Sequence, residues 1–237
     1  MPLQKEATDK IKQDISMTSE AQAELLIRWL STNAFFNVDD VQLDTSGPRL
    51  KALPLQENED NQVIESFTIQ VVPKNNVLSY KNGCIINLLE DFDSLYESED
   101  AAVILELSGD IPRLLLTVIY EMSAGEESSW FHYFQSINLE QFHLPTCLWR
   151  DEFKKALANT KYDLLDQMGD QNLVQLYEAC RQFALVNSQY VEVPKVLSEE
   201  SLKLFSQILS FVLKISVFVD DYHGYSIIPG AELFMNN

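Results

Sequence analysis

The sequence is poor in positive charge and contains no long hydrophobic run. Its 237 residues include 17 Lys and Arg against 36 Asp and Glu, which gives a formal net charge of −19. Such a charge repels phosphate, and proteins that bind nucleic acid usually carry a basic surface, so nucleic acid is not expected as a direct ligand. The longest apolar stretch, residues 210–219, is interrupted by Lys214 and is shorter than the roughly 18 residues of a membrane span. We therefore expect no membrane association.

Cysteine and histidine are also scarce, with three of each. No CxxC pair is present, and the histidines do not complete a zinc pattern, so no metal site is expected. An odd number of widely spaced cysteines favours reduced thiols in an intracellular protein. Cys180 lies within an apolar helical stripe, which predicts a buried structural thiol rather than a nucleophile. The residues concerned are Cys84, Cys147, Cys180, His132, His143 and His223.

Several common catalytic motifs are missing. There is no P-loop, no GxGxxG, no GxSxG and no HExxH, so nothing supports nucleotide binding by a glycine-rich loop, a serine hydrolase or a zinc protease. Residues 90–110 carry eight acidic side chains and no basic one. Paired carboxylates there could serve acid–base chemistry or bind a cation, but blocks of like charge are more often solvated faces, and we favour that interpretation.

What the sequence does contain is a strand-rich start, a long helical block and a strand-rich end. Ser19, with capping-box spacing to Gln22, predicts a helix to about residue 31, and apolar alternation over residues 67–71 predicts a strand. Apolar stripes predict helices around residues 114–122, 173–184 and 202–212, with Gly125 ending the first. Residues 217–219 and 225–228 then predict two strands joined by a polar turn. This order favours an α+β protein with a helical insertion.

Four stretches, in this order, resemble motifs of one enzyme family. They are residues 47–52 (GPRLKA), residues 69–73 (IQVVP) with 77–79 (VLS), residues 130–137 (WFHYFQSI), and residues 218–224 (FVDDYHG) followed by 228–234 (IPGAELF). Together they are similar to the SET-domain protein-lysine N-methyltransferases of the Rubisco-methyltransferase-like class, which includes ribosomal-protein and elongation-factor lysine methyltransferases.

The resemblance implies a SET-type β core that is interrupted by a long helical insertion. It suggests a flexible N-terminus at 1–18, the N-terminal part of the core at 19–110, the insertion at 111–215, and the start of the C-terminal part at 216–237. The C-terminal part would then be truncated or diverged, because the family's tyrosine-bearing segment follows that point. Tyr222 and Tyr225 lie too early in the pattern to replace it, and we expect them to pack as ordinary aromatics.

The resemblance also implies S-adenosylmethionine as the cofactor, whose methyl group is attacked by a neutral lysine amine held in line. The residues that match cofactor-contacting positions are Gly47, Leu50, Ser216, Phe218 and Asn236, and no catalytic residue is assigned. Three positions depart from the family pattern. Arg49 replaces a second glycine, Ser216 occupies the place of an arginine, and the histidine expected beside Asn236 is missing.

Two functions therefore remain open at this stage. The chain is expected to be a lysine methyltransferase acting on a basic protein such as a ribosomal or translation protein, or else a catalytically inactive SET-derived interaction module. A truncated chain that does not fold alone is a further alternative. The acidity suits a basic partner by electrostatic steering, although such acidity more often serves only to keep a chain soluble. A monomer in the cytoplasm, or alternatively in the nucleus, is expected.

Overall fold

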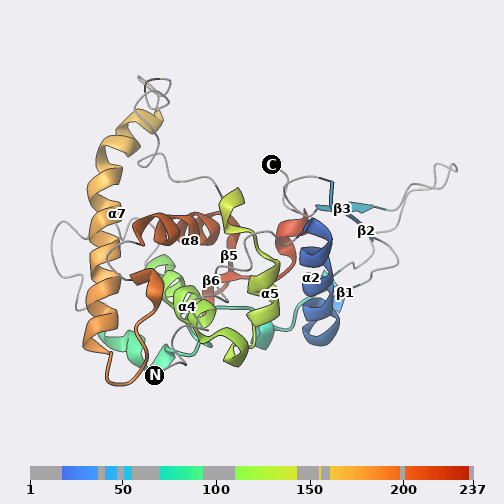
Figure 1. The fold of residues 1–237 in the computed structure, drawn as a ribbon, viewed down its shortest axis with the longest axis horizontal. Helices are drawn as coiled ribbons and strands as arrows, with labels where there is room; N and C mark the ends of the chain where they lie inside the picture. The colour runs from blue at the N-terminus through green and yellow to red at the C-terminus, as the bar shows by residue number, and fades with distance from the viewer. Residues whose placement is uncertain are drawn as a thin grey trace, which may run out of the picture. The chain divides into compact units, whose positions relative to one another are not determined.

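The computed structural model describes residues 18–36, 41–46, 51–54, 70–92, 110–142, 155, 161–197 and 201–234. Internal contacts divide the chain into two compact units. Unit 1 comprises Met1–Val72, His132–Ile137 and Gly230–Asn237, and unit 2 comprises Pro73–Phe131 and Asn138–Pro229. Each unit combines helices with short antiparallel strand pairs (Figure 1).

Unit 1 is organised around helix α2 (Ser19–Asn33). The helix buries one apolar stripe, formed by Ala23, Leu26, Trp29 and Leu30. The predicted helix is confirmed, but the predicted start is wrong by one residue. Thr18 is the N-cap, and its side chain accepts a hydrogen bond from the Ala21 amide at 3.3 Å. Serine is on average the better N-cap, but threonine is also favoured there, so residue type alone did not identify Thr18 as the cap.

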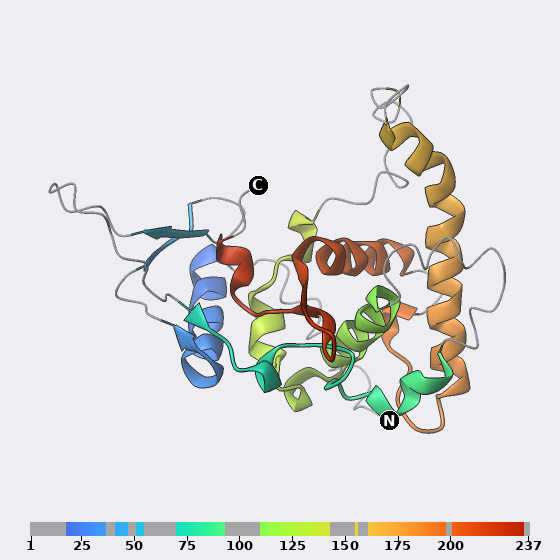
Figure 2. The same ribbon diagram turned by 180° about the vertical axis from the view of Figure 1, so that it is seen from behind.

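The strands of unit 1 form two separate antiparallel pairs. β1 (Phe35–Phe36) pairs with β4 (Gln70–Val71), and β2 (Val41–Asp44) pairs with β3 (Lys51–Pro54). Figure 2 shows α2 and β1 in blue, with β4 in teal. Only the last two residues of the strand predicted at 67–71 lie in the described part of the chain, and both are in β4. The unit also contains most of helix α5 (Phe131–Ser136) and the 3₁₀ helix η11 (Ala231–Phe234).

Unit 2 is built mainly from three helices: α4 (Ile111–Ala124), α7 (Lys161–Val186) and α8 (Leu202–Ile215). All three confirm helices that the apolar stripes predicted. Gly125 follows α4 with φ 58°, a value that favours glycine and ends the helix as expected. Short 3₁₀ helices complete the unit: η2 (Lys74–Asn76), η3 (Ile86–Asp91), η6 (Gly125–Glu127), η7 (Leu139–Gln141) and η10 (Lys195–Leu197).

Aromatic rings join the three helices into one core. Tyr120 of α4 meets Phe183 of α7 edge to face with ring centres 6.2 Å apart. Tyr177 of α7 meets Phe205 of α8 at 5.0 Å. Cys180 lies between these contacts on α7 and is fully buried, which confirms the structural thiol predicted from its stripe. Large buried side chains of this kind supply most of the apolar stabilisation of such a bundle.

The last secondary-structure elements of unit 2 are the strands β5 (Ser216–Asp220) and β6 (Gly224–Ile227). They confirm the two strands predicted around the polar turn. Helix α8 runs directly into β5, because Ser216 is both the C-cap of the helix and the first residue of the strand (Figure 2). The described residues thus form a mixture of helices and small sheets, as an α+β chain should. The four-part domain division stays a prediction.

Among the residues that the structure describes, no helix combines the length and the apolar character needed to cross a membrane.

Candidate cofactor-binding hairpin

The β5–β6 hairpin carries the two predicted cofactor-binding residues that lie in the described part of the chain. The strands are antiparallel, with Ser216 opposite Ile227 and Phe218 opposite Tyr225, and the register shifts between Phe218 and Asp220. Gly224 opens β6 with φ 63° and lies against the Asp110 side chain, so a residue without a Cβ is required there. The sequence folds into a hairpin because short apolar strands flank a turn rich in aspartate and glycine.

Ser216 and Phe218 lie two residues apart on β5 and therefore point to the same face of the strand. Ser216 is half-buried, whereas Phe218 is 57% exposed. The Phe218 ring meets the Tyr225 ring across the hairpin, edge to face with ring centres 6.0 Å apart. An exposed aromatic that is braced by a second ring offers an apolar surface for a flat ligand.

The other three predicted cofactor-binding residues, Gly47, Leu50 and Asn236, lie outside the described residues. The structure therefore brings together Ser216 and Phe218 alone from the predicted set, and the roles of all five stay predictions. Tyr222, which we expected to pack, is 65% exposed at the tip of the hairpin, where its ring contacts the His223 ring. The expectation of packing is wrong for Tyr222, because its side chain projects from the turn between β5 and β6 and stays largely exposed among the described residues.

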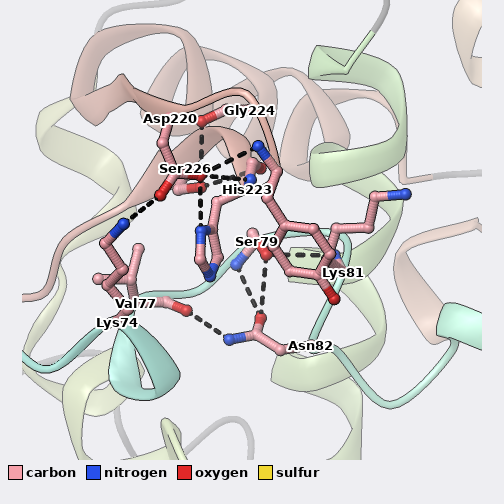
Figure 3. A network of polar contacts seen from close by, with 10 residues as sticks. Lys74, Val77, Ser79, Lys81, Asn82, Asp220, His223, Gly224 and Ser226 are labelled. Carbon is pink, nitrogen blue, oxygen red and sulfur yellow. Dashed lines mark hydrogen bonds and ion pairs between the residues drawn. The ribbon is translucent and has the colours of Figure 1, made fainter.

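Asp220 organises the turn of the hairpin (Figure 3). Its carboxylate accepts hydrogen bonds from the backbone N–H groups of Tyr222 and His223, at 3.1 and 2.8 Å, and faces His223 Nδ1 at 2.8 Å. It also forms an ion pair with Lys74, which belongs to η2. The Lys74 ammonium and the hydrogen bonds from His223 hold the pKa of the Asp220 carboxyl well below its usual range. Sequence reasoning treated this residue only as part of a polar turn.

The segment that follows η2 is hydrogen-bonded to β6, and it also forms hydrogen bonds between its own residues. Leu78 exchanges two backbone hydrogen bonds with Ile227, at 2.9 and 2.8 Å. The Asn82 side chain then fixes the next turn by accepting from the Ser79 amide at 2.9 Å and donating to the Val77 carbonyl at 2.6 Å, as Figure 3 shows. The motif residues at 77–79 thus lie beside the hairpin that carries Phe218, although they are far from it in the sequence.

A buried carboxylate links the next loop to α4. Glu121 accepts from the Cys84 amide at 2.7 Å and from the Ser128 hydroxyl at 2.6 Å. Cys84 is exposed as a residue, but desolvation of its thiol, with a further contribution from Glu121, raises its pKa to about 12. A thiol with that pKa is almost wholly protonated at neutral pH, so Cys84 is not an activated nucleophile. The described residues contain no group of histidine, cysteine or acidic side chains suited to holding a metal ion.

Unit 1 contains a second buried carboxyl that the sequence analysis missed. Glu232 Oε2 accepts a hydrogen bond from the Tyr133 hydroxyl at 3.4 Å, and burial raises the pKa of Glu232 to about 7. Burial, followed by the nearby Glu232 carboxylate, also keeps the pKa of Tyr133 well above its ordinary value. Both residues lie in stretches that carried the resemblance, but nothing in a local apolar pattern marks a glutamate as buried.

Chemically, the described hairpin can bind a flat group at Phe218 and hold the surrounding backbone rigid. Its one histidine is bound to Asp220.

Comparison with known proteins identifies the fold. No family model matches the chain, and no curated protein matches it either. Among solved structures, the chain is similar to the SET domain of LSMT bound to lysine and AdoHcy, with a TM-score of 0.50 and 19% sequence identity. The match covers 90% of this chain and 43% of that one, so the chain spans less than half the length of the solved protein. The likeness supports a SET-like fold.

Proposed function

We propose that the chain is an S-adenosylmethionine-dependent protein-lysine N-methyltransferase. The observation that carries the proposal is the SET-like fold over 90% of the chain, since the similar SET domain is bound to lysine and to AdoHcy. The ordered sequence motifs, which place Phe218 at the position of the family's adenosine-side aromatic, point in the same direction. The assignment to the Rubisco-methyltransferase-like class belongs to this proposal and is based on those motifs.

The residues of the hairpin fit the proposed cofactor. Phe218 is large, aromatic and 57% exposed, so it can cover one face of an adenine ring, and Tyr225 braces it from the facing strand. The cofactor would supply an electrophilic methyl group, which a neutral lysine amine accepts. The role of the chain would be to bind both reactants, exclude water and hold the amine in line with the methyl group.

The proposed substrate is a basic protein, such as a ribosomal or translation protein, and the proposed setting is the cytoplasm or the nucleus. The net charge of −19 supports a basic partner, because opposite charges accelerate encounter and disfavour acidic competitors. We propose that the chain acts as a monomer.

Titration calorimetry with S-adenosylmethionine tests the proposal. We expect saturable one-to-one binding by the wild-type chain. Phe218→Ala should weaken this binding by roughly tenfold or more, since base stacking on an aromatic is worth about 1–3 kcal/mol. Tyr190→Ala is the matched control, because Tyr190 is another aromatic of unit 2 and is 72% exposed. Equal affinities of Phe218→Ala and the wild type would refute the assignment of Phe218 to the cofactor site.

A second candidate function is a catalytically inactive SET-derived interaction module. The observation that favours it is Ser216, a neutral residue where the family has an arginine, at the start of the strand that carries Phe218. This candidate predicts that a chain folded by circular dichroism does not bind S-adenosylmethionine but still binds purified ribosomal proteins in a salt-sensitive manner. Transfer of tritiated methyl groups from the cofactor to lysines of those proteins would exclude it.

A further inference from the structure

The carboxyl group of Glu232 is held in a tightly packed part of unit 1. The 3₁₀ helix η11, which carries it, begins immediately after Gly230, and Leu233 of the same helix is 3% exposed. Gly230 has φ 86°, and a Cβ there would lie 3.0 Å from the Gln70 amide group and 3.1 Å from Leu30. Such close packing on two sides fixes the backbone at Gly230, two residues before Glu232, whose residue as a whole is half-buried.

The tyrosine that contacts the carboxyl lies among other aromatic rings. Tyr133 is fully buried, and its ring lies against Trp29 and Phe134 with ring centres 6.0 and 5.6 Å apart. The hydrogen bond from the Tyr133 hydroxyl to Glu232 Oε2 is 3.4 Å long, beyond the usual range for two oxygens. Glu232 Oε1 is buried, and no donor in the described part of the chain is in hydrogen-bonding geometry with it. The site therefore satisfies an ionised carboxylate poorly.

No cation among the described side chains is paired with Glu232. Helix α2 carries Glu20, Glu24 and Arg28, all of them exposed, and the two residues of β4 are uncharged. His132 of α5 faces Gln135 at 3.4 Å. Strand β3, which packs against η11, contributes Lys51, whose side chain lies outside the described part. The Tyr133 hydroxyl is a titratable group of the described residues that contacts the carboxyl.

Two opposing effects act on the pKa of the Glu232 carboxyl. The backbone N–H groups of Glu232 and Gly230 and the Tyr133 hydroxyl favour the ionised form, whereas burial disfavours it. Burial is the larger effect, and it raises the pKa to about 7. In the unfolded chain the same group titrates near its ordinary value of 4.5. Between pH 4.5 and pH 7, folding of this segment is therefore accompanied by the uptake of a proton at Glu232. The stability that the neutral Glu232 carboxyl contributes is lost as the pH rises from about 4.5 to 7.

We propose that Glu232 is a proton-dependent latch: the neutral carboxyl keeps η11 seated in unit 1, and ionisation of the carboxyl, whose Oε1 has no donor among the described residues, loosens η11. The latch makes no use of the cofactor or of a substrate, so it stands apart from the methyltransferase proposal. It would make the local stability of unit 1 respond to pH within the physiological range, with the tighter state on the acidic side of neutrality.

Carbon-13 NMR of chain labelled at the glutamate carboxyl groups tests the first part of the proposal. One glutamate should titrate near pH 7, and that signal should be missing in Glu232→Gln. Tyr133→Phe removes a donor to the ionised form and should move the titration to a higher pH. Glu140→Gln, which alters an exposed glutamate of η7, is the matched control and should leave the signal in place. Titration of every glutamate near its ordinary pKa would overturn the proposal.

Hydrogen exchange followed by mass spectrometry tests the second part. After correction for the intrinsic pH dependence of exchange, opening of the peptide that spans residues 230–234 should increase on the order of tenfold or more between pH 5 and pH 7 in the wild type. The increase should be absent in Glu232→Gln and retained in Glu140→Gln. If Glu232→Gln does not fold, Tyr133→Phe serves instead, and the increase should then shift to a higher pH. An equal increase in wild type and Glu232→Gln would refute the latch.

Discussion

Replacing Gly224 by alanine tests whether the hairpin is held by the contact between β6 and the start of α4. Gly224 has φ 63°, and an added Cβ would lie 2.3 Å from Asp110 Oδ2. The substitution therefore combines two separate costs, one in the backbone and one in packing. Asp110 occupies the N-cap position of α4, makes no side-chain capping hydrogen bond there, and lies 3.9 Å from Arg113.

The two costs have different magnitudes and can be separated. A left-handed conformation costs an L-residue about 1–2 kcal/mol. The clash with Asp110 adds about 1–3 kcal/mol, as in other overpacked sites, because the carboxyl group must shift. We expect Gly224→Ala to lower the free energy of unfolding by about 2–5 kcal/mol. In an Asp110→Ala background only the backbone cost of about 1–2 kcal/mol should remain. Asp110→Ala alone should be mild, since its ion pair is partly exposed.

Urea unfolding of the four chains of this double-mutant cycle measures both quantities. Gly125→Ala is a useful control, because Gly125 also has a positive φ of 58° but nothing lies within 4 Å of an added Cβ. The loss of unfolding free energy caused by Gly125→Ala should therefore be the same in the wild-type and Asp110→Ala backgrounds. A loss of less than about 1 kcal/mol for Gly224→Ala would refute the reasoning. So would an equal loss in both backgrounds, since the clash with Asp110 would then be absent.

Two further predictions concern the helical core and the Cys84 loop. In urea titrations, Phe183→Ala should lower the free energy of unfolding by about 3–5 kcal/mol. The reason is that Phe183 is fully buried and meets Phe92 and Tyr120 edge to face. A loss below about 1 kcal/mol would contradict this packing. Cys84 should react with iodoacetamide roughly one hundredfold more slowly than a free cysteine at pH 8, because its pKa is about 12. Mass spectrometry of the labelled peptide should show faster reaction in Glu121→Gln, and an unchanged rate would exclude the influence of the carboxylate.

The helices were largely predictable from sequence because each buries a regular apolar stripe. Residues 173–184 show the period of a helix that is buried on one side, and Cys180 lies within that stripe, so both its helix and its burial could be predicted. The β5–β6 hairpin was predictable for a similar reason, since its turn signal is local. The exact N-cap residue of α2 could not be predicted, because Thr18 and Ser19 are both good caps.

The polar contacts of the candidate site could not be predicted in the same way. Lys74 and Asp220 are 146 residues apart in the sequence, and neither local pattern indicates the other. Glu232 was missed because burial of a carboxyl depends on what the rest of unit 1 places around it. A sequence pattern can predict which face of an element is apolar, but it does not show which charged residue a neighbouring element covers.

The pairing between Leu78 and Ile227 has a consequence for the order in which the chain folds. Leu78 leaves the ribosome long before Ile227, and until Ile227 arrives the backbone groups of Leu78 have no strand to pair with. Helices α4 and α7 form from local contacts and can be complete earlier, whereas this non-local pairing must close a long loop. During synthesis the segment around Leu78 is therefore an unpaired edge, which is open to wrong pairing until β6 has been made.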